Sequence, residues 1–392
     1  MSERQLTGLA GRVDARLPHP EDFRSGLRGP RTTARLGGWL GIAFGVCFVT
    51  GLYSHYLQHP SPWVPLLTGP ARLYQVTQGL HVAAGTAAVP LLLVKLWSVF
   101  PRFFQRPSAA PRRLLLDLLE KGSIALLVGS AVFQLVTGLA NSAQWYPWSF
   151  DFISAHFALA WVAVGSVALH VAVKLPVVRE AWGAPVETRP AAPGGLSRRA
   201  LLRTTWLSAA VAALTTTSVG IPGVRRLAVL AVRSGDGPQG VPINRSAIGA
   251  DVVDLLHDPA WRLTVTGPAG AVELTLDDLR AMPQTEAVLP IACVEGWSAG
   301  GTWGGVRVRE LVALVGGGTD RDVAFTSLQP RGGYRTSTLP AAWVGLDDSL
   351  VALTLAGEPL HPDHGFPCRL IAPARPGVLQ TKWLSQVDVV PA

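Results

Sequence analysis

One cysteine, Cys293, stands in a setting that suits metal chemistry. It ends a short apolar run and is followed by a glutamate, a tryptophan and a glycine-rich loop in PIACVEGWSAGGTWGGV, residues 290–306. The chain has two other cysteines, Cys47 and Cys368, and no CxxC motif, so neither a disulfide framework nor a zinc site is predicted. A solitary cysteine is usually a small buried hydrophobe, but its thiolate is also a good metal ligand. This stretch alone leaves both interpretations open.

Four histidines in the apolar first half form a second set: His55, His81, His156 and His170. An ionisable side chain inside a bilayer is costly and marks a functional site by default. Two facing neutral imidazoles can ligate haem iron in a b-type site suited to electron transfer. By residue counting along the helices we pair His81 with His156 and keep His55 as a reserve ligand. One haem is predicted, His170 leaves a second open, and hydrogen bonding within the bundle is the alternative.

The elements that must position these histidines are four long apolar runs, at residues 36–57, 74–97, 122–140 and 154–175. Each is near the ~20 residues that span the hydrocarbon core as a helix. A fifth run, 204–223, is shorter and rich in Ala and Thr. The sequence therefore predicts an all-α transmembrane bundle of about five spans in the lipid bilayer. A transporter is disfavoured because the spans show no internal repeat.

The charged residues orient this bundle. The formal net charge is +8, and only 15% of the residues are charged. The arginines and lysines gather before the first run, between the second and third, and between the fourth and fifth. Positive loops stay in the cytoplasm, so we expect a cytoplasmic N-terminus and an extracytoplasmic part after residue 223. A nucleic-acid partner is not expected, because the charge is not gathered on one folded surface.

Two basic segments bear on export. Residues 1–35 are polar and Arg-rich without an apolar core, so no cleavable signal peptide is expected there. SRRALLR (197–203) resembles a twin-arginine export signal ahead of a mildly apolar segment. A basic loop can also contain paired arginines by chance. If the resemblance holds, the following domain crosses the membrane folded, with its cofactor already bound.

A different pattern begins after a Gly/Pro-rich linker at 224–240. Short β-like runs separated by turns predict a mixed α+β, β-rich domain over 241–392. Strands are expected in WRLTVTG, AVELTLDDL, EAVLPIACV, VAFTSLQ, CRLIAP and WLSQVDVV, and short helices in LRAM and RVRELVALV. Its core is expected to contain five tryptophans, namely Trp261, Trp297, Trp303, Trp343 and Trp383.

Three segments of this domain carry a family resemblance. LPIACVEGWSAGGTWGGVRVREL, YRTSTLP and HPDHGFPCRLIAPARPGVLQTKWLSQVDV together resemble the molybdenum-cofactor domain of the sulfite oxidase family. The resemblance implies that Cys293 gives its thiolate to molybdenum. It also implies that His364, Arg369 and Lys382 hold the pterin and its phosphate, with Asn244 in an early pterin-contact segment. Cys368 is interpreted as a packing residue.

The motifs contain residues that are typical of two different branches of that family. CVEGW after the ligand cysteine is closer to the bacterial periplasmic methionine-sulfoxide reductases, whereas HGFP (364–367) follows the sulfite oxidases. The chain ends at residue 392, and no appended dimerisation domain is expected. In the first half, LHVAAGTAAVPLLLVKLW and HFALAWVAVGSVALHVAVKL resemble the haem-bearing helices of bacterial membrane cytochromes b, over 36–178.

The sequence thus predicts a multi-pass membrane molybdenum oxidoreductase fused to its own cytochrome b. The expected parts are a cytoplasmic Arg-rich tail (1–35), a four-helix haem-b membrane domain (36–178), a cytoplasmic loop (179–203), a fifth transmembrane helix (204–223), a linker (224–240) and an extracytoplasmic molybdopterin-binding domain (241–392).

In the expected reaction, electrons pass from quinol through haem to molybdenum, which removes oxygen from a small S-oxide or N-oxide or from oxidised methionine in proteins. Glu295 is the hypothetical proton donor, or else a structural carboxylate. The alternatives are sulfite oxidation with reversed electron flow, and a haem-only carrier with a relic domain.

Overall fold

The computed structural model describes residues 20–23, 25–61, 63–105, 111–183, 185, 195–221, 224–231 and 237–391. The predicted tail and linker lie partly outside these residues. The chain forms two compact units. The helical unit comprises 1–48, 84–140 and 146–213, and the sheet unit comprises 49–83, 141–145 and 214–392. Since the boundary runs through four helices, α2, α3, α4 and α6, the sheet unit includes parts of the predicted membrane segment.

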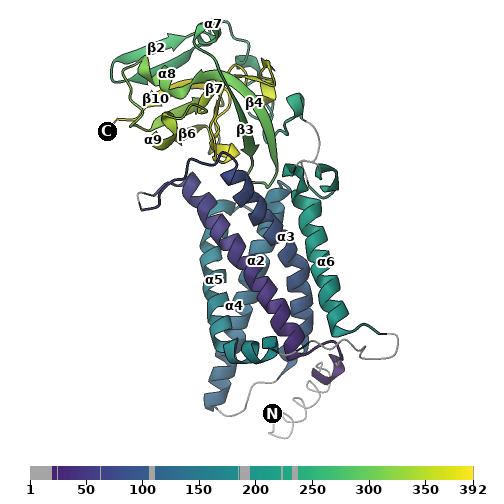
Figure 1. Cartoon of the computed structure of the whole chain (residues 1–392). Helices are drawn as coiled ribbons and strands as arrows, with labels where there is room; N and C mark the ends of the chain where they lie inside the picture. Colours follow the sequence, from purple (N-terminus) through teal and green to yellow (C-terminus); the bar gives the residue numbers. More distant parts are fainter. Residues whose placement is uncertain are drawn as a thin grey trace, which may run out of the picture. The chain divides into compact units, whose positions relative to one another are not determined.

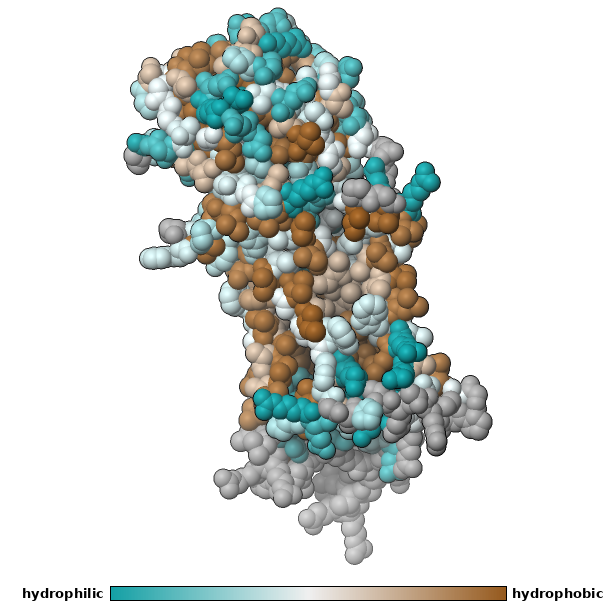
Figure 2. Space-filling view, in the orientation of Figure 1, coloured by the Kyte–Doolittle hydropathy of each residue, from teal (hydrophilic) through white to brown (hydrophobic). Residues whose placement is uncertain are grey.

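Five long helices follow one another along the first part of the chain (Figure 1). They are α2 (Pro30–Gln58), α3 (Leu73–Val99), α4 (Pro111–Ser142), α5 (Phe152–Gly183) and α6 (Arg198–Thr217). The four predicted spans fall within the first four, and these four are long and apolar enough to cross a membrane. Large apolar side chains lie exposed on their surfaces (Figure 2), such as Ile42, Leu93 and Leu169. Such helices indicate association with a membrane.

The predicted fifth span is a helix of a different character. It begins at Arg198 rather than near residue 204, and it is not among the described helices that are apolar enough to cross a membrane. Hydroxyl groups interrupt its surface: Thr204 donates to the carbonyl of Ala200 at 3.1 Å, and Ser208 to that of Thr204 at 2.9 Å. Four spans are therefore supported, and the fifth stays a prediction.

Side-chain packing holds the helices of the helical unit together. Leu36 of α2, Leu91 of α3 and Ala209 of α6 form one buried cluster. The ring centroids of Phe48 and Trp161 lie 4.9 Å apart between α2 and α5. The contacts extend over α2, α3, α5 and α6, as expected of a bundle.

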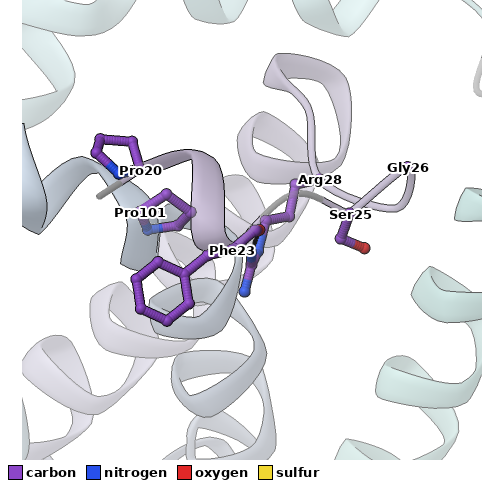
Figure 3. A pocket seen from close by; sticks show the side chains of 6 residues that line it. All are labelled: Pro20, Phe23, Ser25, Gly26, Arg28 and Pro101. Carbon is purple, nitrogen blue, oxygen red and sulfur yellow. Dashed lines mark hydrogen bonds between the residues drawn. The ribbon is translucent and has the colours of Figure 1, made fainter. Parts of the chain in front are cut away.

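The segment before α2 is attached by aromatic contacts. Phe23, at the end of η1 (Pro20–Phe23), stacks on Phe104 of η2 (Phe100–Phe104) with ring centroids 5.0 Å apart. Arg28 lies over the ring of Trp97 at 4.5 Å and donates to the carbonyls of Trp97 and Phe23. Figure 3 shows Arg28 and Phe23 lining a hollow here. Arg28 already donates to two carbonyls. We therefore interpret the residues around this hollow as attaching the segment before α2, and not as a ligand-binding site.

Residues 241–391 contain two sheets (Figure 1). The first has the order β2-β1-β10-β5-β6 and the second β3-β4-β7-β8, with β9 also paired to β7. The strands are β1 (Leu263–Gly267), β2 (Gly270–Leu274), β3 (Thr285–Ala292), β4 (Ser298–Arg307), β5 (Val323–Ser327), β6 (Thr336–Leu339), β7 (Leu350–Leu355), β8 (Glu358–Pro359), β9 (Arg369–Ile371) and β10 (Leu384–Val389). The short helices are α7 (Leu276–Ala281), α8 (Val308–Ala313) and α9 (Ala341–Val344).

The predicted mixed α+β domain is therefore confirmed. β1 pairs with β10 in parallel, and the other strand pairs are antiparallel. The five predicted tryptophans are all buried, three of them almost completely: Trp303, Trp343 and Trp383. Indole rings of this size dominate the apolar area that such a core removes from water.

Two local predictions were wrong. The second half of AVELTLDDL is helix α7, because Thr275 and Asp278 form a capping box in which each side chain accepts from the other residue's backbone N–H. The glycine-rich stretch after Cys293 is not a loop but strand β4, which pairs with β3 along the whole of β3. Glycine is needed there because β7 lies very close: a Cβ at Gly305 would lie 2.1 Å from the carbonyl oxygen of Val351.

We predict that Gly305→Ala destabilises the protein by about 2 kcal/mol, since the added methyl group overpacks β4 against β7. Gly300→Ala in the same strand is the matched control, because a Cβ there meets nothing within 4 Å. Thermal unfolding of the full chain in detergent, followed by tryptophan fluorescence, measures both. Equal stability of the two variants would contradict the close approach at Gly305.

Candidate active site

A tight turn between β3 and β4 presents Cys293. The N–H of Cys293 donates to the carbonyl of Trp297 at 2.9 Å, and the N–H of Gly296 donates to the carbonyl of Cys293 at 3.0 Å. Gly296 has a φ of 99°, a conformation that favours glycine. The sequence CVEGW is thus a closed turn, and its first residue is held in place by the strand pair on either side.

A pocket opens beside this turn. Its lining includes four residues that the sequence predicts for the site: Asn244, Cys293, Arg369 and Lys382. They come from segments far apart in the chain, and β3, β9 and the start of β10 position three of them. The structure therefore brings the predicted thiol and both predicted cations to one cavity.

Arg369 is buried at the start of β9. Its guanidinium donates to the carbonyls of His364 and Gln380, each at 3.1 Å, and lies 5.0 Å from the ring of Trp303. Burial lowers the pKa of Arg369 to about 9, which leaves the group positively charged at neutral pH. The carbonyl oxygens fix its direction but do not neutralise it.

Lys382 lies at the same pocket, just before β10. Its Nζ donates to the carbonyls of Asp363 at 2.9 Å and Arg245 at 2.5 Å, with the side-chain oxygen of Asn244 at 3.4 Å. Burial lowers its pKa well below the usual value. Among the described residues, no carboxylate forms an ion pair with Lys382 or Arg369. Buried charges are stable only when they are paired, so the pocket is suited to an anionic ligand such as a phosphate.

His364 occupies a different place from the one expected of a ligand-binding residue. Its Nε2 lies 2.6 Å from the carbonyl oxygen of Pro238, and the side chain is buried. Burial, the largest cause, lowers the pKa of His364 to about 4, although the Pro238 carbonyl opposes this. Its own carbonyl accepts from Arg369. The structure therefore places His364 behind Arg369, where it positions the guanidinium through the backbone.

Glu295 and Cys368 complete the residues singled out in the sequence. Glu295 lies within the Cys293 turn, where its carboxylate accepts from Trp297 Nε1 at 2.9 Å and from Gln144 Nε2. Cys368 is fully buried, and burial raises the pKa of its thiol. These surroundings suit the expected packing role of Cys368, and they leave both expected roles of Glu295 open.

Other pocket residues were missed by the sequence interpretation, namely Arg245, Tyr334 and Thr381. Tyr334 opens the motif YRTSTLP, and Arg245 directly follows Asn244, so the quoted motifs contained a signal for both. The hydroxyl of Tyr334 donates to Gln58 Oε1 at 3.1 Å.

Two of the histidines on the long helices, His81 and His156, each contact a threonine. In the sheet unit, His81 Nδ1 lies 3.1 Å from Thr50 Oγ1, and a Cβ at Gly51 would lie 3.0 Å from His81 Cε1. In the helical unit, His156 Nδ1 lies 3.0 Å from Thr137 Oγ1. A polar partner on one ring nitrogen fixes the orientation of a histidine, as in metal-bound imidazoles.

The two arrangements share a sequence. Thr50 and Gly51 belong to the segment VTGL at 49–52, and Thr137 and Gly138 belong to an identical VTGL at 136–139. A Cβ at Gly138 would lie 3.8 Å from His156 Cε1, so glycine again faces the imidazole ring. The segment VTGL therefore occurs twice, and each copy places a threonine and a glycine against a histidine ring.

The two remaining histidines are placed differently. The ring centroid of His55 lies 4.8 Å from that of His59, which directly follows the end of α2. His170 lies on α5 one turn before Lys174, whose Nζ pairs with Glu120 at 2.7 Å. The described residues contain no group of three or more His, Cys, Asp and Glu that would hold a metal ion.

The second half of the chain matches a known family. Residues 250–392 match the oxidoreductase molybdopterin binding domain. The chain is similar to the putative protein-methionine-sulfoxide reductase subunit YedZ1 of Azospira oryzae (32% identical over 142 residues, 36% of this chain and 53% of that protein). It is also similar to the uncharacterized oxidoreductase YuiH of Bacillus subtilis (33% over 130 residues, 33% and 64%) and to mitochondrial sulfite oxidase of Homo sapiens (31% over 164 residues, 35% and 30%). The matches thus span between 30% and 64% of these relatives.

We predict that Cys293→Ser abolishes the molybdenum content of the purified chain, because a serine hydroxyl is a poor substitute for a soft thiolate. Cys368→Ala is the matched control: it removes another buried thiol, costs about 1 kcal/mol of stability and keeps the metal. Elemental analysis of both variants measures this. Molybdenum retained in Cys293→Ser, or lost equally in both variants, would contradict the assignment.

We also predict that the folded protein loses stability as the pH falls from about 6.5 to about 4. In the unfolded chain His364 has its ordinary pKa of 6.5 and binds a proton over this range, whereas in the folded chain it does not bind one until about pH 4. The loss from this group reaches about 3 kcal/mol. Chemical denaturation at a series of pH values measures it. His364→Gln should flatten this dependence, whereas the same change at exposed His257 should leave it intact.

Proposed function

We propose that this chain, whose residues 250–392 belong to the oxidoreductase molybdopterin binding domain family, is a membrane enzyme that removes oxygen from an S-oxide or N-oxide with electrons supplied through its own b-type haem. The domain makes the chain an oxidoreductase. One observation carries the proposed site: the pocket joins a buried thiol to the buried Arg369 and the half-buried Lys382, neither of which forms an ion pair with a carboxylate among the described residues.

The residues of the pocket fit the molybdopterin cofactor. In this proposal Cys293 gives its thiolate to the metal, and Arg369 and Lys382 hold the pterin phosphate with Asn244 beside them. Arginine and lysine suit a phosphate through charge and hydrogen bonds. When bound, the cofactor supplies the exchange of an oxygen atom and two electrons with the substrate.

Glu295 is the proposed proton donor in this turn. It lies two residues from Cys293, and two N–H donors, from Trp297 and Gln144, fix its carboxylate. Glu295→Gln should then lower turnover and change its pH profile. An unchanged profile would leave Glu295 the structural role of tying Trp297 to Gln144.

The helical segments fit a haem of b type. His81 and His156 are the proposed axial ligands, because each imidazole is oriented by a threonine and faced by a glycine. His55 is the reserve ligand, and His170 would serve a second haem. When bound, haem accepts and passes on one electron at a time.

The proposed setting of the reaction is the cell membrane. Quinol is the proposed electron donor, and the basic loops favour a cytoplasmic N-terminus with the catalytic domain on the other side. The paired arginines Arg198 and Arg199 at the start of α6 favour export of the folded domain. A small S-oxide or oxidised methionine in a protein is the proposed substrate, which agrees with the name of the Azospira oryzae relative.

A second candidate reverses the electron flow. The similarity to a sulfite oxidase and the HGFP spelling at 364–367 favour oxidation of sulfite or another small reductant, with electrons delivered to quinone. Both candidates use the same pocket and the same histidines. They differ in the substrate and in the direction of electron flow between that substrate and the quinone.

We predict that methionine sulfoxide drives quinol oxidation by the full chain in detergent, and that sulfite drives little quinone reduction. His81→Ala and His156→Ala should each lose the b-type absorbance and the quinol-linked turnover, whereas His257→Gln should lose neither. Absorbance of quinone and haem during turnover measures all of these. Quinone reduction by sulfite without the opposite reaction would favour the second candidate.

A further inference from the structure

The turn that carries Cys293 rests on one face of α3. Gln75, Gln78 and Val82 are spaced by three and four residues, which places them on one face of the helix. Gln75 Nε2 donates to Ser298 Oγ at 3.1 Å, and Gln78 Nε2 donates to the carbonyl of Val294 at 2.8 Å. Val82 packs on Gly296, where an added Cβ would lie 2.7 Å from Val82 Cγ2. We call Gln75, Gln78 and Val82 the α3 seat.

The amide of Gln78 is itself fixed. Its oxygen faces the hydroxyl of Tyr74 at 3.5 Å, and that hydroxyl lies 3.0 Å from Ser54 Oγ of α2. Tyr74, Ser54 and Gln78 are all buried. Because the oxygen is turned to Tyr74, the NH₂ group is turned to Val294. A buried donor with a fixed direction is costly to leave without its acceptor.

A second segment, which contains Asn141 and Gln144, also donates hydrogen bonds to this turn. Asn141 Nδ2 donates to the carbonyl of Val294 at 3.3 Å, and Gln144 donates to Glu295 and to the carbonyl of Asn244 at 3.4 Å. The carbonyl next to Cys293 thus accepts from two amides that belong to the helical segments. All of these residues lie within the sheet unit. These hydrogen bonds converge on Val294 and Glu295, which directly follow the predicted metal ligand, and they therefore fix the position of the turn.

We propose that Gln78 is a positioning residue that seats the Cys293 turn on the helix of His81, and that electrons enter the catalytic domain across this contact. The inference rests on the proposed function. Gln78 lies one turn before His81, and Val82 follows His81 directly. From Gln78 the route needs one hydrogen bond to Val294 and then the peptide chain to Cys293. Each S-oxide takes up two electrons and two protons and gives a thioether and water, while quinol becomes quinone and releases two protons.

Gln78→Leu in the full chain tests the seat, with Thr77→Val as the matched control. The hydroxyl of Thr77 bonds the carbonyls of Leu73 and Tyr74 within its own helix, at 3.1 and 3.2 Å. Hydrogen exchange of peptides covering 293–298 should become roughly tenfold faster in Gln78→Leu, because a buried hydrogen bond is lost, and stay unchanged in Thr77→Val. Equal exchange in the two variants would overturn the seat.

Electron delivery gives the second measurement. Quinol-driven turnover of Gln78→Leu should fall severalfold, while turnover driven by reduced methyl viologen, which reduces the catalytic domain directly, should be kept, as should the haem absorbance and the molybdenum content. Loss of both turnovers together, or of neither, would overturn the electron route. A wild-type chain without haem or molybdenum would refute the proposed function instead, and the exchange experiment would still test the seat.

Discussion

The cost of burying positive charge governs the catalytic pocket. Arg369 is buried and Lys382 is half-buried, and burial lowers the pKa of each. Their hydrogen bonds go to carbonyl and amide oxygens, which direct the two groups without cancelling their charge. A fold that holds two such groups around one thiol is incomplete until an anion enters. The same desolvation is the physical reason for which we propose that this pocket binds an anionic group.

The surrounding structure keeps these groups in place. β9 and β10 carry the two cations to one side of the pocket, and the β3–β4 turn carries Cys293 to another. His364 supports Arg369 from behind through its carbonyl, and burial lowers the pKa of its imidazole although the Pro238 carbonyl opposes this. The conformation of Gly296 and the hydrogen bond to the Trp297 carbonyl close the Cys293 turn. Side chains far apart in sequence thus converge because the sheets are paired in this order.

Much of this was predictable from the sequence. The four long apolar helices follow from the length of the apolar runs alone, and the motifs around Cys293 and Arg369 contained most of the pocket residues. Strand β4 was not predicted because glycines have little intrinsic preference for a strand, and the close approach of β7, as at Gly304 and Gly305, is visible only in the structure. The contact of Gln78 with Val294 could not be predicted, since more than two hundred residues separate them. The VTGL repeat was a signal available in the sequence, but its meaning appears only when each threonine is seen on its histidine.

The central claim is that one polypeptide combines a molybdenum site with a haem-bearing membrane part. Metal analysis of the detergent-purified full chain, with a haem assay on the same sample, tests it most directly because it needs no knowledge of the substrate. We expect stoichiometric molybdenum together with iron that is present entirely as b-type haem. Iron without molybdenum in properly exported protein would contradict the enzyme. Molybdenum without haem would contradict the fusion of the two functions.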